Sequence, residues 1–218
     1  MNGRSWTVAV FVALSFPVHV HAQSVGLGAR VGSLGLGGEA TLGLSDSFAL
    51  RGGFGVFPYE YEGEFEGEDY LVTFPTSAWS IGVDFYPGGG PFRLMGGFIG
   101  RSGDLGLEAD VTDTRQIGGT TYTESGTLLG TLDQGSVAPF AALGFGKHYD
   151  GGLGLFVDLG VAFTGEPDVR LEATGPLAAQ PGIQQDLDQE AQEIEDDSGS
   201  YLEFWPIVNL GFKIPLGG

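Results

Sequence analysis

The chain contains no cysteine, so it can form neither a disulfide bond nor a thiolate metal site. Lysine and arginine are also scarce, with nine against 28 acidic residues, and the formal net charge is −19. Nucleic acid is therefore not expected as a partner, because binding to phosphate requires clustered cations. Histidine occurs only three times, which leaves few groups for proton transfer near neutral pH.

Long apolar runs are missing everywhere except near the N-terminus, where the first 22 residues have the three parts of a secretory signal peptide. Arg4 supplies a positive charge, an apolar run extends from Trp6 to Phe16, and Ala22 offers a small residue at the cleavage position. The run is shorter than the roughly 20 residues that span a bilayer, so a membrane anchor is the less favoured alternative. We predict export and cleavage after Ala22. A single domain of residues 23–218 remains, and its charge is −20 because Arg4 is the only ionised residue removed.

Glycine (40 residues) and aromatic residues (12%) are abundant, which favours closely packed strands over disorder. Without a second long apolar run, a membrane-embedded mature chain must be a closed β-barrel, because only helices and barrels satisfy every backbone hydrogen bond in lipid. From Leu153 to Phe163 the odd positions are apolar and the even positions are mostly small or polar. The last segment, from Leu202 to Ile214, repeats this alternation, although Pro206 removes one donor from the expected ladder. Period-two patterns of this kind predict strands that face lipid on one side.

The connectors between the expected strands alternate in length. The short connectors are Ser45 to Ser47, Pro87 to Pro91 and His148 to Gly152, and the long ones are Tyr61 to Asp69, Ser102 to Ser136 and Gly165 to Ser200. Outer-membrane barrels have short periplasmic turns and longer extracellular loops, so the alternation predicts which end of the barrel faces outward.

The strand count depends on the segment from Val25 to Leu44. Its apolar residues change from odd to even positions at Gly32-Ser33, which predicts a two-residue hairpin turn that pairs Val31 with Leu34 on the outer face. With this hairpin the barrel has eight strands. A single long strand with a bulge at Gly32 is the alternative, and it would make the number odd or move a terminus.

The pattern resembles the small eight-stranded outer-membrane barrels of the OmpA, OmpX and OmpW type. The C-terminal tail is similar to the signal by which the outer-membrane assembly machinery recognises barrels, and its matching residues are Asn209, Gly211, Phe212, Ile214 and Leu216. The resemblance implies a bacterial outer-membrane location among lipid and lipopolysaccharide. It implies no particular activity, because a fold does not fix function.

The faces that turn inward carry charges of both signs. We predict an interior polar network of Arg30, Glu39, Arg51, Asp84, Arg93, Asp158, Glu203 and Lys213. Pairing Phe85 with Phe92 would place Asp84 directly opposite Arg93, and pairing Leu42 with Leu50 would place Arg51 diagonal to Glu39. Because eight strands leave an interior that side chains fill, bridged charges are interpreted as a plug. A gate in a narrow conduction path is the alternative.

Two acidic segments lie in the long connectors. The first is a weak candidate for binding divalent cations, through Glu62, Glu64, Glu66, Glu68 and Asp69. A solvated loop is favoured over a cation site, because no spacing matches a dedicated calcium loop.

The second acidic segment predicts a short helix from Gln184 to Asp197 over the barrel mouth, since Ile183, Leu187, Ala191 and Ile194 recur at helical spacing. A mobile arm or a docking surface is the alternative. In the middle long connector, the polar and glycine-rich run from Gly118 to Thr123 predicts the tip of a surface hairpin.

Catalytic groups are few, because two histidines leave with the signal peptide and only His148 remains. Its connector is assigned to the periplasm, so it is interpreted as a solvated turn residue rather than as part of a Ser-His-Asp arrangement or a zinc site. We expect no cofactor and a non-enzymatic barrel that serves envelope integrity or surface contacts. The alternatives are a narrow channel for small apolar or cationic solutes and, less favoured, an enzyme that modifies lipid A or phospholipid.

Overall fold

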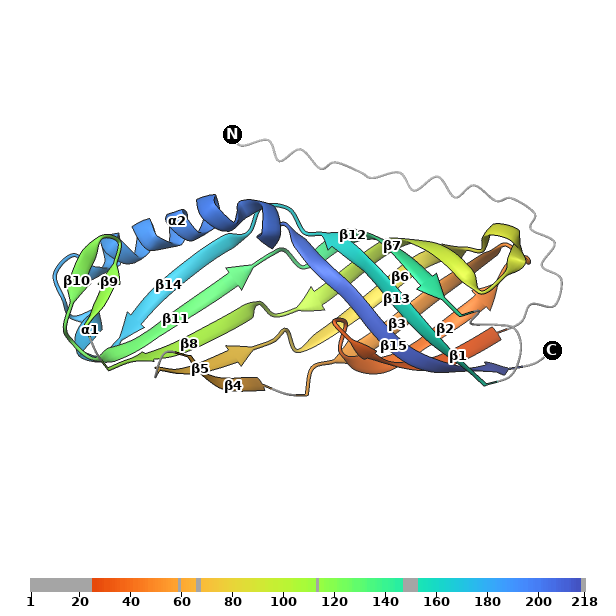
Figure 1. Ribbon diagram of the computed structural model, residues 1–218, viewed down its shortest axis with the longest axis horizontal. Helices are drawn as coiled ribbons and strands as arrows, with labels where there is room; N and C mark the ends of the chain where they lie inside the picture. The colour runs from red at the N-terminus through yellow and green to blue at the C-terminus, as the bar shows by residue number, and fades with distance from the viewer. Residues whose placement is uncertain (1–24, 59, 66–67, 113, 147–152, 217–218) are drawn as a thin grey trace, which may run out of the picture.

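A computed structural model of the chain describes residues 25–58, 60–65, 68–112, 114–146 and 153–216 (Figure 1). The expected signal peptide and His148 lie outside these residues. The molecule is elongated, with a barrel at one end and a sheet that continues beyond it, covered by a long helix.

Eight antiparallel strands form the closed barrel, as the alternating pattern predicts. They are β1 (Val25–Gly32), β2 (Leu36–Gly43), β3 (Phe48–Val56), β6 (Ser77–Phe85), β7 (Phe92–Ser102), β12 (Val137–Phe145), β13 (Gly154–Phe163) and β15 (Phe204–Leu216). The barrel closes where β15 pairs with β1, from Val25 opposite Leu216 to Gly32 opposite Asn209. The predicted fold class, an all-β closed antiparallel transmembrane barrel of eight strands, is confirmed.

The outer surface of the barrel is apolar, whereas the lumen holds both charged and apolar side chains. In β13, Leu155, Val157 and Leu159 are exposed, whereas Phe156 and Asp158 between them are buried. Outward aromatic side chains gather at the two ends of the wall. At the end of the barrel where β1 begins and β15 ends lie Phe48, Phe85, Phe92 and Phe145, and at the opposite end lie Phe54, Trp79, Phe163 and Phe204. An apolar band between aromatic girdles is the surface that a transmembrane barrel presents to lipid.

The segment from Val25 to Leu44 forms a hairpin rather than one bulged strand. The turn differs from the predicted one, because Gly35 N donates to Gly32 O and Gly35 adopts a left-handed φ of 81°. This four-residue turn moves the register by two, so Arg30 pairs with Gly37. The predicted outward position of Leu34 is therefore wrong, since Leu34 is 2% exposed and points into the barrel.

Pro206 removes no ladder bond, contrary to the expectation from its sequence position. Val208 directs its N–H and C=O toward Ser33, at 2.9 Å for each bond, so Pro206, two residues earlier, faces the same side. The pairing of β1 with β15 ends at Gly32 opposite Asn209. An N–H at position 206 would therefore have no partner in β1, so proline is tolerated there.

The three long connectors fold into a second antiparallel sheet beyond the barrel. Its strands are β14 (Asp168–Thr174), β11 (Gly126–Asp133), β8 (Leu105–Val111), β5 (Glu68–Thr73) and β4 (Glu60–Phe65), in that order. A small hairpin, β9 (Arg115–Ile117) with β10 (Thr120–Tyr122), stands at the far tip. The predicted hairpin tip is present, but its turn is only Gly118-Gly119, both at positive φ, and Thr120 to Tyr122 belong to β10.

Two helices, α1 (Gly175–Ala178) and α2 (Ile183–Leu202), follow β14. The predicted apolar stripe of α2 is buried at Ile183, Leu187 and Ala191. The predicted position over the barrel mouth is wrong, because α2 lies along the sheet and returns toward the barrel only at its C-terminal end (Figure 1). Among the described residues, no helix has the length and the low polarity needed to cross a bilayer.

The distribution of polar and apolar side chains between the two faces is reversed in the second sheet relative to the barrel. Gln134, just after β11, bonds to Arg101 on the lumen side, so Leu128 and Leu132 belong to the same side of the sheet. Leu128 there packs against the cluster that α2 contributes to. In the barrel, the lumen side carries charge and the outside is apolar. In the sheet, the lumen side is apolar and the outside is acidic.

Candidate functional site

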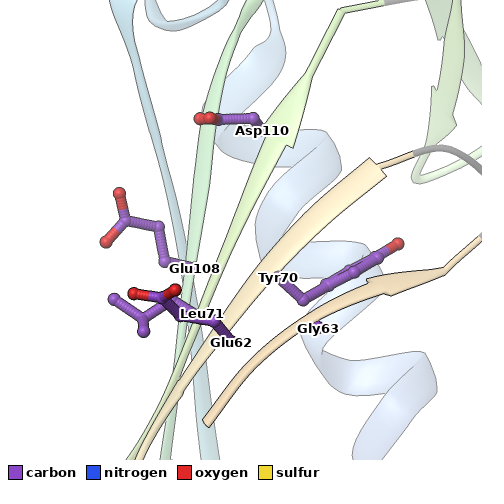
Figure 2. Close-up of a pocket in the computed structure, with 6 residues that line it drawn as sticks. All are labelled: Glu62, Gly63, Tyr70, Leu71, Glu108 and Asp110. Carbon is purple, nitrogen blue, oxygen red and sulfur yellow. The ribbon is translucent and has the colours of Figure 1, made fainter. Parts of the chain in front are cut away.

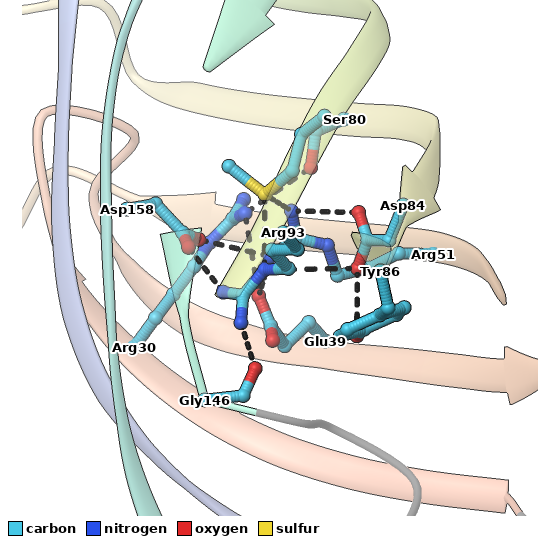
Figure 3. Close-up of polar contacts among 10 residues, drawn as sticks. Arg30, Glu39, Arg51, Ser80, Asp84, Tyr86, Arg93, Gly146 and Asp158 are labelled. Atoms are coloured by element: carbon cyan, nitrogen blue, oxygen red, sulfur yellow. Dashed lines mark hydrogen bonds and ion pairs between the residues drawn. The ribbon is translucent and has the colours of Figure 1, made fainter. Parts of the chain in front are cut away.

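Arg51 is the centre of the polar network in the lumen (Figure 3). Its Nη1 lies 2.9 Å from Asp158 Oδ2 and 3.5 Å from Glu39 Oε2, and its Nη2 lies 3.2 Å from Asp84 Oδ1. The three carboxylates come from β13, β2 and β6, so one guanidinium joins four strands. All four side chains are almost completely buried.

Arg93, near the start of β7, forms a second centre closer to the end of the barrel with the short turns. Its guanidinium donates to Asp158 Oδ1 and to the backbone carbonyl of Gly146, and its Nε lies 3.8 Å from Asp84 Oδ2. The guanidinium also lies 5.7 Å from the centre of the Phe156 ring, within the range of a cation–π contact. Tyr86 closes this end by donating from its hydroxyl to Asp84 Oδ2 at 3.4 Å.

Arg30 completes the network on the opposite wall. Its Nη1 lies 3.8 Å from Glu39 Oε2 and donates to Ser80 Oγ at 3.1 Å. The three arginines therefore face three carboxylates, and their formal charges cancel. A balanced, buried set is the arrangement in which burial of charge costs least, because each charge has a partner.

Glycines make room for these arginines. A Cβ at Gly144 would lie 2.5 Å from Arg93 Nε, and a Cβ at Gly53 would lie 2.9 Å from Arg30 Nη1. Both contacts are closer than real Cβ atoms show. The narrow lumen thus accommodates arginine on one strand only because the facing position has no side chain.

The predicted network was based on two cross-strand residue pairs, of which one is present and one is not. Leu42 pairs with Leu50 as expected, and Arg51 lies opposite Thr41. The pairing of Phe85 with Phe92 is wrong, since Phe85 pairs with Leu94 and Asp84 lies opposite Met95. The 3₁₀ turn η1 (Pro87–Gly89) lengthens the connection between the two strands.

The two remaining predicted network residues, Glu203 and Lys213, lie toward opposite ends of β15. Lys213 is buried near the end of β15, opposite Gly28 and Gly154. Glu203 precedes β15 at the rim, where its carbonyl accepts from Thr164 N at 2.9 Å.

An apolar layer fills the lumen beyond the network, on the side of the second sheet. It consists of Leu34, Ala78, Ile99, Ala138, Ala162, Trp205 and Ile207, with Phe57 and Phe140 packed against it. Arg101 covers this layer, with its guanidinium 4.5 Å from the centre of the Trp205 ring and 3.1 Å from Gln134 Oε1. Between the layer and the network, the described residues leave a cavity of about 20 Å³. A volume of this size holds about one water molecule.

The outer face of the second sheet is acidic. Register places five residues in one row across its strands, namely Glu62, Leu71, Glu108, Leu129 and Glu172. Figure 2 shows the shallow hollow at one end of this row, where Glu62 and Glu108 flank Leu71. Of the weak cation candidates, Glu62 lies in this hollow, whereas the side chains of Glu64, Glu66, Glu68 and Asp69 lie outside the described part. Within that part, no three acidic or histidine side chains converge as metal ligands.

Carboxylates also attach α2 to the rest of the sheet. Tyr122 donates to Asp186 Oδ2 at 2.5 Å, Gly118 N donates to Glu190 Oε2 at 2.9 Å, and Val169 N donates to Glu195 Oε1 at 2.7 Å. The hydrogen bond to Asp186 raises the pKa of Tyr122 to about 12.

Several residues of the site were not predicted from the sequence. Arg101, Gln134 and Trp205 lie at strand ends, where inward and outward positions are hard to assign without the register. The strand β8 carried a usable signal, since Leu105, Leu107, Ala109 and Val111 alternate with polar or small residues. Its position inside a long connector obscured that signal.

No protein-family model matches the chain, and no curated protein sequence is similar to it. Two crystal structures from Acinetobacter baumannii superpose over most of its length. CarO2 has a TM-score of 0.68 at 18% identity, covering 90% of this chain and 100% of its own. CarO has a TM-score of 0.62 at 15% identity, covering 88% and 96%. The chain shares the fold of these proteins. A major outer membrane protein from Thermus thermophilus gives a TM-score of 0.37, which is too low to indicate a common fold.

Proposed function

We propose that the protein is a non-enzymatic barrel of the bacterial outer membrane that serves envelope integrity or contacts at the cell surface. The observation that carries the proposal is the filled lumen, in which a neutral ion-pair network and an apolar layer occupy successive levels. A barrel that is closed in this way offers no path to solutes. The remaining part able to act is the sheet with its helix. It lies at the end of the barrel opposite the short turns, which in outer-membrane barrels face the periplasm, and this supports a position outside the cell.

Three features support the outer-membrane location. They are the apolar band with its two aromatic girdles, the export signal expected in residues 1–22, and the C-terminal pattern. In β15, Phe212, Ile214 and Leu216 lie on the lipid-facing side, whereas Asn209 faces the lumen. We propose that the assembly machinery recognises this strand before it pairs with β1. The finer likeness to the OmpA, OmpX and OmpW barrels belongs to the same proposal, as do lipid and lipopolysaccharide as surroundings.

The location is tested by fractionation and surface labelling of intact cells. We expect the protein in the outer-membrane fraction, with heat-modifiable migration on a denaturing gel. A cysteine introduced at Glu172 on the outer face of the sheet should react with an impermeant maleimide, whereas one introduced at Ser47 in a short turn should not. Recovery as a soluble periplasmic species, or labelling of Ser47 alone, would contradict the proposal.

A narrow channel is the second candidate, and one observation favours it. Arg30 Nε and Nη2 and Asn209 Oδ1 have no hydrogen-bond partner among the described residues, and both side chains line the cavity of about 20 Å³. A water molecule bound to these atoms would form one step of a path that conducts solutes through the lumen. Planar-bilayer recording separates the two functions: absence of conductance in both the native protein and Arg93→Ala supports the sealed barrel, and steady conductance of the native protein supports the channel.

A further inference from the structure

A cavity lies between α2 and the lumen-side face of the second sheet, far along the molecule from the arginine network. Its volume is about 160 Å³. The sheet supplies Leu107, Ala109, Leu128, Gly130 and Leu171, and the helix supplies Leu187 and Ile194. The polar residues of the lining are Tyr70, Arg115, Gln116 and Glu190.

The cavity exists because α2 covers only part of the apolar face. The helix packs chiefly on β14, whereas β8, β5 and β4 continue the face beyond its edge. On that uncovered part Tyr61 is 63% exposed and Leu107 is 44% exposed. The cavity therefore borders the uncovered face on the side of β8, and Leu187 and Ile194 close it on the side of α2.

The size of the cavity limits the ligand. A dry cavity of about 150 Å³ lined by leucine and similar residues accommodates benzene. A peptide helix, with a diameter of about 10 Å including side chains, is too large. One aromatic ring or a short branched alkyl group fits the volume and the lining.

The charge around the cavity limits the polar end of the ligand. Helix α2 carries seven acidic residues and no lysine or arginine. Among the described residues that line the cavity, Arg115 is the only cationic one, and Glu190 is a lining residue of opposite charge. Acidic groups in excess repel an anion and attract a cation, so a carboxylate ligand is disfavoured.

We infer that this cavity binds a small apolar molecule about one aromatic ring in size, whose polar end is neutral or cationic. The inference rests on the proposed function to the extent that such a ligand reaches the protein from outside the cell. Binding itself does not depend on the lumen being sealed or on the cellular location.

Methyl NMR of the full mature chain in lipid nanodiscs tests the inference with three probes: benzylamine, benzyl alcohol and benzoate. Methyl signals of Leu107 and Leu187 report the cavity, and those of the lipid-facing Leu155 report partition into lipid. We expect saturable shifts at the cavity methyls, with benzoate weaker than benzylamine by about tenfold.

Two glycines of neighbouring strands give a matched pair of variants. A Cβ at Gly130 would make ordinary contacts of 3.5 Å and 3.7 Å with Leu171 and Leu107, so Gly130→Leu fills the cavity without disturbing the backbone. Gly106 lies on the opposite face, where the nearest contact of a Cβ is Thr73 at 3.4 Å. Gly130→Leu should abolish the saturable shifts, and Gly106→Leu should retain them.

Three results would overturn the inference: no saturable shift at Leu107 and Leu187, shifts that persist in Gly130→Leu, or equal binding of benzoate and benzylamine. Because the readout is binding to folded protein, a failure here is distinguishable from a failure of the fractionation and conductance experiments.

Discussion

Arg51 and its three carboxylates show how a narrow barrel tolerates charge in its lumen. The guanidinium on β3 reaches carboxylates from three other strands, β2, β6 and β13, at once. Each member is stabilised by the others rather than by water. Loss of one member therefore leaves the rest buried and uncompensated.

Replacing Arg51 tests this dependence directly. Arg51→Met retains the volume but leaves Glu39, Asp84 and Asp158 without their shared partner, and we expect a loss of about 3–5 kcal/mol in the free energy of unfolding. Urea unfolding of the refolded barrel, followed by tryptophan fluorescence, gives the value.

The matched control is Arg170→Ala, which breaks the exposed pair between Arg170 Nε and Asp168 Oδ1 at 2.9 Å. This pair is more than half exposed on both sides, so its removal should cost less than about 1 kcal/mol. Equal losses in the two variants would show that the lumen network does not stabilise the barrel.

Gly144 gives a second prediction at this scale. In Gly144→Ala the new methyl group would collide with Arg93, so the arginine must leave its partners, at a cost of about 1–3 kcal/mol. Gly96 faces the opposite side of β7, where a Cβ would meet only Phe140 O at 3.8 Å. Gly96→Ala should therefore leave the unfolding midpoint unchanged, and a larger loss there than at Gly144 would contradict the packing described.

At the scale of elements, α2 is attached to the sheet by an apolar stripe and by carboxylate hydrogen bonds. The helix extends to Leu202 rather than ending near Asp197, because its last carbonyl accepts from Gln134 Nε2 and Thr164 Oγ1 at the barrel rim. It is thus fixed both at the tip of the sheet and at the barrel.

The apolar stripe predicts local protection against hydrogen exchange. Leu187 is 1% exposed, and Leu187→Ala should destabilise the docked helix by about 2–5 kcal/mol. Amide exchange in α2 should accelerate, while amides of the barrel strands stay protected. Asp188→Ala, on the exposed side, is the control, and equal acceleration in both variants would argue against docking through Leu187.

The bond between Tyr122 and Asp186 predicts a dependence on alkaline pH. The pKa of Tyr122 is raised from 10.0 to about 12, so the folded state favours the neutral phenol. The stabilisation is complete below pH 10.0 and is lost as the pH rises through about 12. Titration of tyrosinate absorbance should show one late-titrating tyrosine in the native protein that is missing in Tyr122→Phe. Identical profiles after scaling for tyrosine number would contradict the bond.

At the scale of the whole molecule, the pattern of the barrel was readable and that of the second sheet was not. Alternation over β13 and β15 predicted lipid-facing strands, and the change of phase near Gly32 predicted the extra hairpin that makes eight. Register was less accessible, since Gly35 and the turn η1 each shifted a pairing by two residues. The segments of β8, β11 and β14 were assigned to loops. Period-two alternation does not show whether a strand lies within the membrane or continues beyond it.

The outward side chains change from polar in the second sheet to apolar in the barrel, and this change is the central feature of the molecule. Along β11 and β12 the outward odd positions pass from leucine, threonine and aspartate to a continuous apolar series, with Asp133 and Val137 on either side of the boundary. Above that boundary the outward face meets water, and below it the same face meets lipid. This change places the membrane surface between the two strands.

Spin labels at single introduced cysteines test this claim most directly, because the chain has no cysteine of its own. Labels at odd positions from Leu129 to Asp133 should collide with a water-soluble nickel complex in nanodiscs. Labels at odd positions from Val137 to Leu143 should instead collide with oxygen dissolved in lipid. Water accessibility that continues through Leu143, or lipid accessibility that begins already at Leu129, would contradict a membrane surface between β11 and β12.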